Sequence, residues 1–394
     1  MERAPIVIVG GGLAGSATAL HLARKGQPVC LLERGQFPRE KVCGEGLMPH
    51  GVHELDGLGL LEQVLETEPQ RYAGIGYRVG DTRAEGRFPG GKTGLGIRRS
   101  RVDSVLHAAC LAEPNIDVRT QVRVSDVVHQ ADGVHVKTSD GPIHAQVVVG
   151  ADGLGSLIRR KSGLKLDAKG SPRYGVRMHV RLADDAANSE FVEVQLGDEL
   201  EWYVTPTGPG QANIALLCEK SIAKTFGGNL ENTFWSMVRK EPHLDRWSEG
   251  AEPISQAKLC GPLRQEVRST ATDRVVLVGD AAGFVDAITG EGMSLSLLEA
   301  RLAADVLVQA LASGDTSRAS LMRYHRMRVR QSRSLVWFTR ILLFGLRHRT
   351  FTHHIIRNLA RHPDAFGRLL GVNIGERALW RVPPRDLIRL TAGI

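Results

Sequence analysis

Apolar residues near the start of the chain form two short runs with a helical segment between them. The first run, Ile6–Val9, is β-branched and stops at Gly10, and the following residues Ser16–Arg24 have the apolar pattern of a helix. The second run, Pro28–Leu32, ends at Glu33. This order predicts a strand, a tight turn, a helix and a second strand.

The turn carries glycines with the spacing G-x-G-x-x-G. Gly10 lets the strand turn sharply, Gly12 lets backbone N–H groups approach a pyrophosphate, and Gly15 lets the helix pack closely on the strand. The helix N-terminus attracts an anion, and Glu33, about twenty residues further on, is placed to accept hydrogen bonds from adenosine ribose hydroxyls. The set predicts a bound dinucleotide; a packing turn without a ligand is the alternative.

A buried strand followed by glycines occurs again in the middle of the chain. Val147–Val149 leads into Gly150-Ala151-Asp152-Gly153. Asp152 and Ser156 are placed to cap the helix that starts there.

A third strand of this kind, Arg274–Val278, is followed by Asp280. The acidic residue stands at the carboxyl end of the strand, where ligands meet parallel sheets. Gly290-Glu291-Gly292 then opens a long helix that extends to about Leu311, and its first N–H groups suit an electron-rich ring edge. An aspartate that only caps a helix is the alternative.

Between the second and third motifs the period of the pattern changes to two. Apolar and polar residues alternate from Tyr174 to Cys218. Short strand-like segments broken by glycines also fill 72–97, between the first and second motifs. The alternation predicts an antiparallel sheet with one exposed face. Its apolar segments 202–205 and 213–217 suit either the wall of a pocket or plain core.

Two further segments suit either a ligand or a structural role. The loop 34–49 is rich in glycine and proline, and Cys43 within it is small enough to stand beside a flat ligand or to be a buried thiol. Arg98-Arg99-Ser100-Arg101 opens a helix, Val102–Leu111, where arginines can reach a phosphate or form a solvated edge.

Beyond Thr316 the chain has a helical pattern rich in arginine. A basic amphipathic helix lies on a membrane surface in some proteins and more often packs on its own domain with solvated arginines, so a peripheral membrane contact stays open. The most apolar run, Leu335–Leu346, is interrupted by Arg340 and is too short for a membrane span. The histidines of this region lack the H-E-x-x-H pattern, so we expect no metal site.

Composition adds a few limits. With 394 residues, 42% of them hydrophobic, the chain is long enough for two moderate cores. The net charge of +8 is concentrated in the C-terminal arginines, so we expect no nucleic-acid partner. The five cysteines form no C-x-x-C pair, and the first apolar run has no basic leader, so we expect a reducing, cytoplasmic location.

Together the three motifs resemble those of the glutathione-reductase-type FAD flavoproteins, in the branch that holds para-hydroxybenzoate hydroxylase, the geranylgeranyl reductases and the flavin-dependent halogenases. The resemblance spans nearly the whole chain. It implies an α/β fold in which a Rossmann-like, three-layer FAD-binding domain of the ββα type is interleaved with an antiparallel-sheet substrate domain and followed by C-terminal helices. The implied ranges are 1–71 with 98–170 and 266–315 for the FAD-binding domain, 72–97 with 171–265 for the substrate domain, and 316–394 for the helical region.

The resemblance also implies residue roles. The first glycines and Glu33 hold the ADP half of FAD, Asp280 binds the ribitol, and Gly292 and Met293 offer backbone donors near the flavin pyrimidine edge. The middle motif with Arg159 serves both FAD and NAD(P)H in the hydroxylases. The residues expected to contact FAD are Gly10, Gly12, Leu13, Ala14, Gly15, Glu33, Arg34, Arg101, Asp152, Asp280, Gly290, Gly292 and Met293.

Within this branch the motifs differ in how well they match the reductases, the hydroxylases and the halogenases. Cys43-Gly44-Glu45-Gly46-Leu47 and the stretch from Gly279 to Gly292 resemble the geranylgeranyl reductases. Hydroxylases usually have His at the position of Gly283 and Pro at that of Ala287. Halogenases usually carry a W-x-W-x-I-P segment, and none of the tryptophans of this chain sits in one.

The resemblance therefore implies a FAD-dependent oxidoreductase that acts on a hydrophobic small molecule. The complete middle motif narrowly favours a monooxygenase that takes electrons from NADPH or NADH and hydroxylates through a flavin hydroperoxide. One alternative is a geranylgeranyl-reductase-like enzyme that reduces carbon-carbon double bonds, with Cys43 as the tentative catalytic proton donor. The other is a non-catalytic prenyl-lipid carrier. No motif identifies the substrate, the preferred nicotinamide or the oligomeric state.

Overall fold

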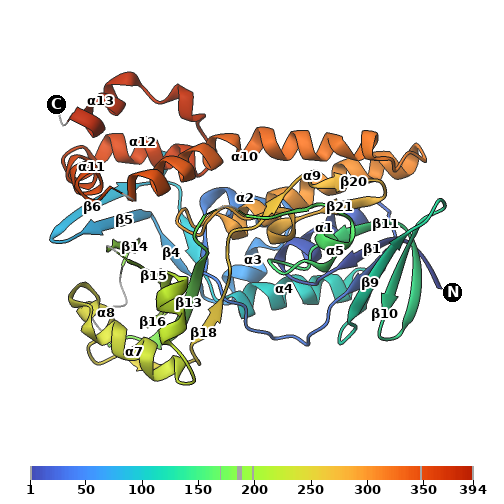
Figure 1. Ribbon diagram of the computed structural model, residues 1–394, viewed down its shortest axis with the longest axis horizontal. Helices are drawn as coiled ribbons and strands as arrows, with labels where there is room; N and C mark the ends of the chain where they lie inside the picture. Colours follow the sequence, from blue (N-terminus) through green and yellow to red (C-terminus); the bar gives the residue numbers. More distant parts are fainter. Residues whose placement is uncertain (1, 169, 184–188, 198, 347, 393–394) are drawn as a thin grey trace.

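Two eight-stranded sheets form the body of the molecule, and a long helix, α10, runs along one side of it (Figure 1). The computed structural model describes residues 2–168, 170–183, 189–197, 199–346 and 348–392. The N-terminal sheet and the second sheet lie at opposite ends of the view, and the last helices gather over β5 and β6 (Figure 1).

The first sheet has a parallel centre in the order β8-β2-β1-β11-β21. β20 and β10 add antiparallel neighbours to β21 and β11, and β9 pairs with β10. The strands are β1 (Glu2–Val9), β2 (Val29–Leu32), β8 (Ile116–Arg119), β9 (Val124–His129), β10 (Val134–Thr138), β11 (Gly141–Gly150), β20 (Ala271–Thr272) and β21 (Val275–Leu277).

Successive residues of β1 point to opposite faces of this sheet and join different cores. Ile6 and Ile8 pack with residues of α1 (Leu13–Ala23), α4 (Arg99–Ala112) and α9 (Gly292–Ala312). Val7 and Val9 pack with residues of the β9–β10 meander and α5 (Leu157–Lys161). Because both faces are covered, the strand is apolar without alternation. The predicted three-layer α/β domain is confirmed.

The second sheet has the order β17-β13-β16-β15-β14-β5-β6. Its neighbours are antiparallel except β14 and β5, which run parallel. The sheet is therefore not purely antiparallel as predicted, because β5 and β6 arrive from a much earlier part of the chain and parallel strands need such a long connection. The strands are β5 (Gly74–Val79), β6 (Thr82–Arg87), β13 (Arg173–Arg181), β14 (Phe191–Leu196), β15 (Leu200–Gly208), β16 (Gln211–Glu219) and β17 (Glu252–Pro253).

A small three-stranded sheet joins the two halves. It pairs β7 (Gly94–Gly96) with β3 (Gly46–Leu47) on one side and β4 (Gln70–Tyr72) on the other. A Cβ built on Gly96 would lie 1.7 Å from the carbonyl oxygen of Pro206, so only glycine lets β7 approach β15 this closely. The ends of the predicted 72–97 segment thus belong to this small sheet.

The C-terminal region is helical, as predicted. α10 packs on α9, and the hydroxyl of Tyr324 on α10 donates to the carbonyl of Leu277 on β21 at 3.0 Å. The later helices cover β5 and β6 with Ile356, Phe366 and Leu370. Within the described residues, no helix has both the length and the apolarity to cross a bilayer. The helices are α10 (Arg318–Leu346), α11 (Arg349–Arg361), α12 (Pro363–Asn373) and α13 (Pro384–Ala392).

The remaining elements are short or cover the outer face of the second sheet. Trp202 of β15 packs there against Phe234 of α7. These elements are α2 (Pro49–Gly57), α3 (Leu61–Leu65), α6 (Lys220–Thr225), α7 (Leu230–Lys240), α8 (Asp245–Ser248), β12 (Lys165–Leu166) and β19 (Glu266–Val267). The eighth strand of the second sheet, β18 (Lys258–Cys260), pairs antiparallel with β13.

Candidate cofactor and substrate site

The N-terminus of α1 has the shape that a pyrophosphate needs. Gly10 has a φ of +106°, which favours glycine, and a Cβ built on Gly15 would lie 1.8 Å from the carbonyl oxygen of Gly10. The N-cap residue, Gly12, has no side chain to bond the first amides of the helix, so these N–H groups can bind an anion. The turn therefore fits a dinucleotide phosphate.

Glu33 supports this turn from the end of β2. Its Oε2 accepts a hydrogen bond from the amide of Gly11 at 2.8 Å, and its Oε1 accepts one from the amide of Gly35 at 2.9 Å. Each oxygen of this buried carboxylate keeps a lone pair for a ribose hydroxyl. Arg34 is exposed, whereas Arg39 Nη2 lies 3.5 Å from Glu33 Oε2. The arginine that lies beside the glycine turn is thus Arg39 and not the predicted Arg34. No pattern in the sequence indicated Arg39.

The arginine of α4 that lines the pocket is Arg99, in place of the predicted Arg101. Arg101 Nη1 donates to the carbonyl of Thr67 at 2.7 Å. Arg99 is buried, and its Nη2 lies 2.8 and 3.0 Å from the two carboxylate oxygens of Asp103. Burial opposes the charge of Arg99, but Asp103 and Cys43 raise its pKa above the ordinary value. The sequence does not show which of these arginines faces the pocket, because nearby residues of a helix point to different faces.

The middle motif shapes the floor beneath the pocket. The Asp152 carboxylate accepts hydrogen bonds from Ser156 Oγ at 2.5 Å and from the amide of Leu157 at 2.6 Å, and so caps α5. Buried Arg159 donates to the carbonyl of Asp280 at 3.2 Å. Asp152 therefore acts on the turn in this structure, and Arg159 holds the loop that carries Asp280.

One pocket brings together most of the residues predicted to contact the cofactor. They come from the turn before α1, the loop after β21 and the N-terminus of α9, whose first amides also have no side-chain cap. Two helix N-termini thus open on one pocket, as a ligand with a phosphate and an electron-rich ring would require. These residues are Gly12, Leu13, Ala14, Asp280, Gly290, Gly292 and Met293.

Asp280 enters this pocket as a charged group. Its Oδ2 lies 2.9 Å from Nζ of Lys41. Burial opposes ionisation of Asp280, but Lys41, Arg99 and Arg159 hold its pKa below the ordinary value. The carboxylate is therefore ionised at neutral pH and is available to accept hydrogen bonds from ligand hydroxyls.

The opposite wall of the pocket comes from the second sheet and is mainly apolar. Its residues on β14, β15 and β16 are Val192, Tyr203, Thr205, Ala215, Leu216 and Leu217. Cys43 lines the same pocket from the loop before β3, and its Sγ accepts a hydrogen bond from the amide of Glu45 at 3.3 Å. The pocket thus has a polar side for a cofactor and an apolar side for a second molecule.

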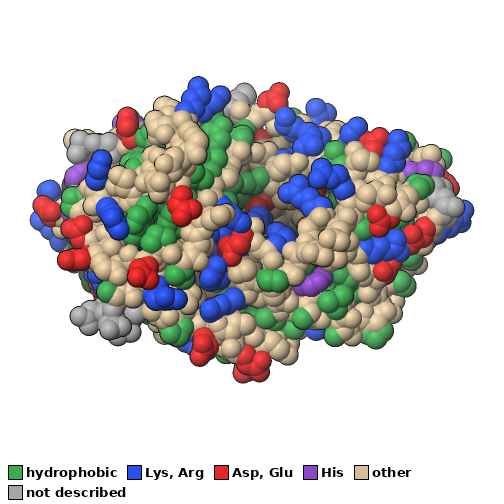
Figure 2. Space-filling model, turned by 90° about the horizontal axis from the view of Figure 1, so that it is seen from below, with side chains coloured by type: hydrophobic (Ala, Val, Ile, Leu, Met, Phe, Trp, Pro, Cys, Tyr) green, Lys and Arg blue, Asp and Glu red, His purple; other side chains and the backbone are tan. Residues whose placement is uncertain are grey.

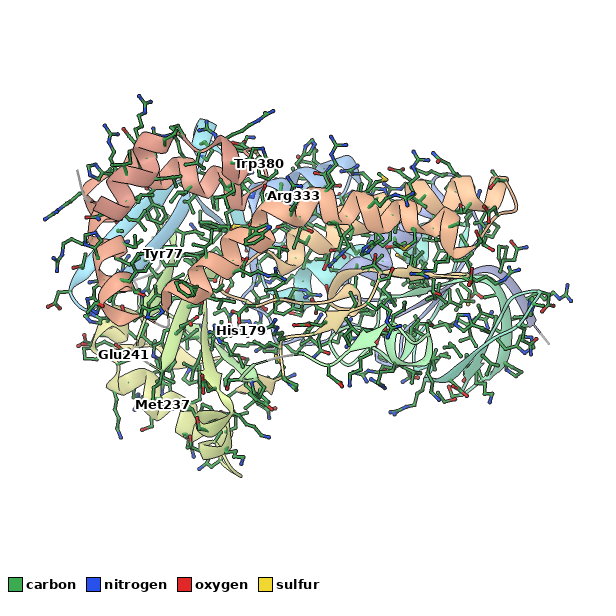
Figure 3. All side chains as sticks on the ribbon, turned by 45° about the horizontal axis from the view of Figure 1, so that its top comes forward. Tyr77, His179, Met237, Glu241, Arg333 and Trp380 are labelled. Carbon is green, nitrogen blue, oxygen red and sulfur yellow. The ribbon has the colours of Figure 1, made fainter. Side chains whose placement is uncertain are left out.

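A buried charge network lies directly behind Cys43. Glu45 Oε1 accepts a hydrogen bond from the amide of Arg99 at 2.9 Å, and Glu45 Oε2 lies 2.6 Å from His179 Nε2. His179, labelled in Figure 3, also places Nδ1 3.0 Å from Ser255 Oγ. The network ties the Cys43 loop to the second sheet.

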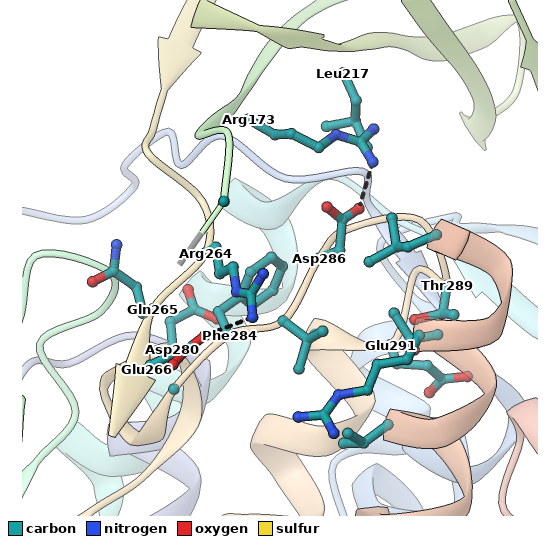
Figure 4. A pocket seen from close by; sticks show the side chains of 18 of the residues that line it. Arg173, Leu217, Arg264, Gln265, Glu266, Asp280, Phe284, Asp286, Thr289 and Glu291 are labelled. Carbon is teal, nitrogen blue, oxygen red and sulfur yellow. Dashed lines mark ion pairs between the residues drawn. The ribbon is translucent and has the colours of Figure 1, made fainter. Parts of the chain in front are cut away.

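A second pocket opens between the loop 279–291, the second sheet and α10. Figure 4 shows its ion pair between Arg173 and Asp286, whose N–O distance is 3.2 Å. Glu291 lines this pocket and the first one, and its side chain lies below Thr289 in the view (Figure 4). Seen from below, the surface is hollowed between the two halves, with Lys and Arg side chains around the hollow (Figure 2).

A family model described as FAD binding domain matches residues 3–339. The chain belongs to this FAD-binding family. The match covers both sheets, α9 and most of α10, so the family architecture extends well beyond the phosphate turn.

Curated relatives of this FAD-binding protein carry out different reactions. It is 31% identical over 323 residues to a menaquinone reductase of Mycolicibacterium smegmatis, which covers 77% of this chain and 76% of the relative. It is 29% identical to digeranylgeranylglycerophospholipid reductase 2 of Methanothermobacter thermautotrophicus, over 81% of each chain. It is 28% identical to a 3-hydroxybenzoate 6-hydroxylase of Klebsiella oxytoca, over 85% of this chain and 86% of the relative.

Solved structures give the same fold. The flavin-dependent brominase Bmp2 superposes with a TM-score of 0.83 at 19% identity, over 98% of this chain and 97% of that chain. Taken with the relatives, the family establishes a FAD-dependent oxidoreductase, so the non-catalytic carrier alternative falls away.

Three residues of this FAD-binding protein were missed at the level of sequence. Glu45 and Glu291 each sit between two glycines, and His179 is one of many polar residues in an alternating strand. A carboxylate between two glycines of a ligand loop is unusual, so the sequence did offer a signal for the two glutamates. It offered none for His179, the partner of Glu45, because the two residues are distant in sequence.

Proposed function

We propose that this protein uses FAD to reduce a carbon-carbon double bond in a hydrophobic small molecule bound against the second sheet. The observation that carries the proposal is the pocket itself, where Cys43 and Asp280 face an apolar wall on β14, β15 and β16. Two relatives are named as reductases, one of menaquinone and one of a digeranylgeranylglycerophospholipid, which supports a reductase. NADPH or NADH is the proposed source of electrons.

Bound and reduced, FAD would supply the hydride. The residues that would hold it are the glycines before α1, Glu33, Asp280 and the amides at the start of α9. Cys43 would give the second hydrogen as a proton, so that the double bond gains one hydride and one proton.

The apolar wall has a second role in this proposal. It excludes water from the reacting bond and orients a substrate that has few polar groups of its own. Thr205 and the phenol of Tyr203 are the exceptions on the wall. The hydroxyl of Tyr203 is already used, because it donates to Glu201 at 2.8 Å.

The monooxygenase that the middle motif favours is the second candidate, and its support is the hydroxylase among the relatives. Gly283 and Ala287 stand where hydroxylases usually carry His and Pro, which is why the reductase comes first.

The deciding experiment is a half-reaction without oxygen. The purified holoenzyme is reduced with NADPH or NADH and mixed anaerobically with menaquinone or with a digeranylgeranylglycerophospholipid, while the flavin absorbance is followed. We expect reoxidation and, after the extract is exposed to air so that any quinol returns to the quinone, a product that is still two hydrogens heavier by mass spectrometry. Reoxidation that requires oxygen, with a product that has gained one oxygen atom, would support the monooxygenase instead.

A further inference from the structure

Glu291 is a buried acid without a hydrogen-bond partner. Its side chain is 3% exposed, and neither Oε1 nor Oε2 has a partner among the described residues. Burial raises its pKa well above the ordinary value for Glu. The side chain is therefore a neutral carboxylic acid at neutral pH, able to give up a proton.

The position of Glu291 connects it to the reacting pocket. It is the N-cap residue of α9, between Gly290 and Gly292, and all three line the pocket that also contains Cys43. Burial raises the pKa of the nearby phenols of Tyr72 and Tyr77, so neither competes as an acid or base near neutral pH.

His50 of α2 lies on the far side of Glu291. Its Nε2 is 3.2 Å from Glu291 Oε2, although the geometry does not complete a hydrogen bond. Burial lowers the pKa of His50 to about 4, although Glu54 opposes this. His50 Nδ1 is buried away from water. With the imidazole proton on Nδ1, Nε2 keeps a lone pair that can take a proton and pass it on.

His50 also lines a separate groove. The groove has a volume of about 1010 Å³ and lies between α2, α9, α10 and α12. Its lining includes His53, Arg326, Arg330 and Arg377 as well as His50. His50 thus touches both this groove and Glu291.

We propose that His50 and Glu291 form a proton relay that carries protons from water in this groove to the reacting pocket. The inference rests on the proposed reduction, which uses one proton in each turnover. Cys43 gives its proton to the substrate carbon, and Glu291, which lines the same pocket, returns one to the thiolate. The Glu291 carboxylate takes a proton from His50 Nε2, which lies 3.2 Å from it, and Nε2 takes its own proton from groove water, so His50 returns to the same tautomer. Charge and protons balance after each cycle.

The relay separates the first turnover from later ones. In Glu291→Gln, Cys43 has time to take a proton from another source before substrate is added, so the first anaerobic oxidation of reduced enzyme should keep nearly its normal rate. Steady-state turnover should fall about tenfold or more, because the thiolate waits for another proton source. His50→Gln should behave in the same way, and His53→Gln, a change at a groove residue on the same helix, should not.

A measurement without substrate keeps this test independent of the reaction. The infrared spectrum of the resting holoenzyme at pH 7 should contain a protonated carboxyl band that is absent in Glu291→Gln. In heavy water this band should shift quickly in the wild type and in His53→Gln, and about tenfold or more slowly in His50→Gln.

The possible results distinguish a failure of the relay from a failure of the proposed reaction. If the band is absent, or if His50→Gln exchanges as fast as the wild type, the relay is wrong whatever the enzyme catalyses. If the infrared results hold but no alkene is reduced, the proposed reaction fails and the relay stands as a proton path for another. Glu291→Asp, which keeps an acid at the position, serves if Glu291→Gln loses its FAD or its thermal stability.

Discussion

Glu45 Oε2 lies 2.6 Å from His179 Nε2, and both side chains are completely buried. The contact joins the loop that carries Cys43 to the centre of β13. Glu45 adopts a φ of +62°, a conformation unusual for a residue with a side chain, so the backbone accepts strain to place this carboxylate. The pair therefore fixes one wall of the pocket relative to the other.

We expect His179→Ala to lower the free energy of unfolding by about 3 kcal/mol or more, because it leaves a buried carboxylate without its partner. Urea denaturation of the holoenzyme measures the change. Arg87→Ala is the matched control, since it breaks an exposed pair with Glu190 and should cost less than about 1 kcal/mol. A loss no larger than that of the control would mean that the buried pair does not hold the two walls together.

Asp280→Asn should weaken FAD binding while leaving the fold intact. A hydrogen bond to a charged group contributes about 1.5–3 kcal/mol, which corresponds to an affinity loss of roughly 10- to 150-fold. Because Lys41 and neighbouring arginines lower the pKa of Asp280, wild-type affinity should stay constant from pH 5 to 8. Fluorescence titration of apoprotein with FAD tests both statements, with Asp315→Asn as an exposed control. Unchanged affinity in Asp280→Asn would move the ribitol elsewhere.

FAD itself should be held without a covalent bond, since no motif offers a specific attachment residue. Heating the holoenzyme until it precipitates should release all of the flavin into the supernatant. Yellow colour that stays with the washed precipitate would contradict this expectation.

The sequence predicted the parts of the fold that depend on local pattern. The turn at Gly10, the strand before Asp280 and the start of α9 all follow from glycines and apolar runs, and the structure brings Gly12, Asp280 and Gly292 to one pocket. Local pattern cannot say which face a long side chain reaches. This is why Arg101 was chosen where Arg99 lines the pocket.

Pairings between distant segments were also beyond the sequence. The parallel contact of β14 with β5 joins residues more than a hundred positions apart, and neither strand signals its partner. The same holds for Glu45 with His179 and for His50 with Glu291. Each depends on how the two halves pack, which periodicity does not encode.

Cys43→Ser distinguishes the two candidate reactions. If Cys43 gives the proton in a reduction, turnover should fall by about 10²–10⁴, the usual contribution of a general acid. If Cys43 is only a small wall of a monooxygenase pocket, the loss should stay below about tenfold, because the volume hardly changes. Turnover at saturating NADPH, with flavin content matched, measures the difference. Cys260→Ser, at another cysteine of the same pocket, should stay near wild type in either case.

Glu291 also makes stability depend on pH in a direction that can be worked out. Its pKa is raised in the folded protein, whereas in the unfolded chain it is about 4.3. Above that pH the folded protein holds a proton that the unfolded chain has lost, so wild-type stability falls as pH rises, by up to about 1.4 kcal/mol per pH unit from this group. Glu291→Gln has no such proton and should gain stability relative to wild type between pH 5 and pH 8.

Asp386 provides a comparison of opposite sign for this last prediction. A hydrogen-bonded ion pair with Arg368, 2.6 Å between Nε and Oδ2, lowers the pKa of Asp386. The stability it contributes is present above the ordinary Asp pKa and is lost as pH falls below it. Asp386→Asn should therefore be less stable than wild type at pH 7, with a deficit that shrinks toward pH 3. Urea denaturation of both variants and the wild type across this range measures the two trends. If the difference between Glu291→Gln and wild type stayed constant from pH 5 to 8, Glu291 would be ionised in the folded protein and could not supply protons to the pocket.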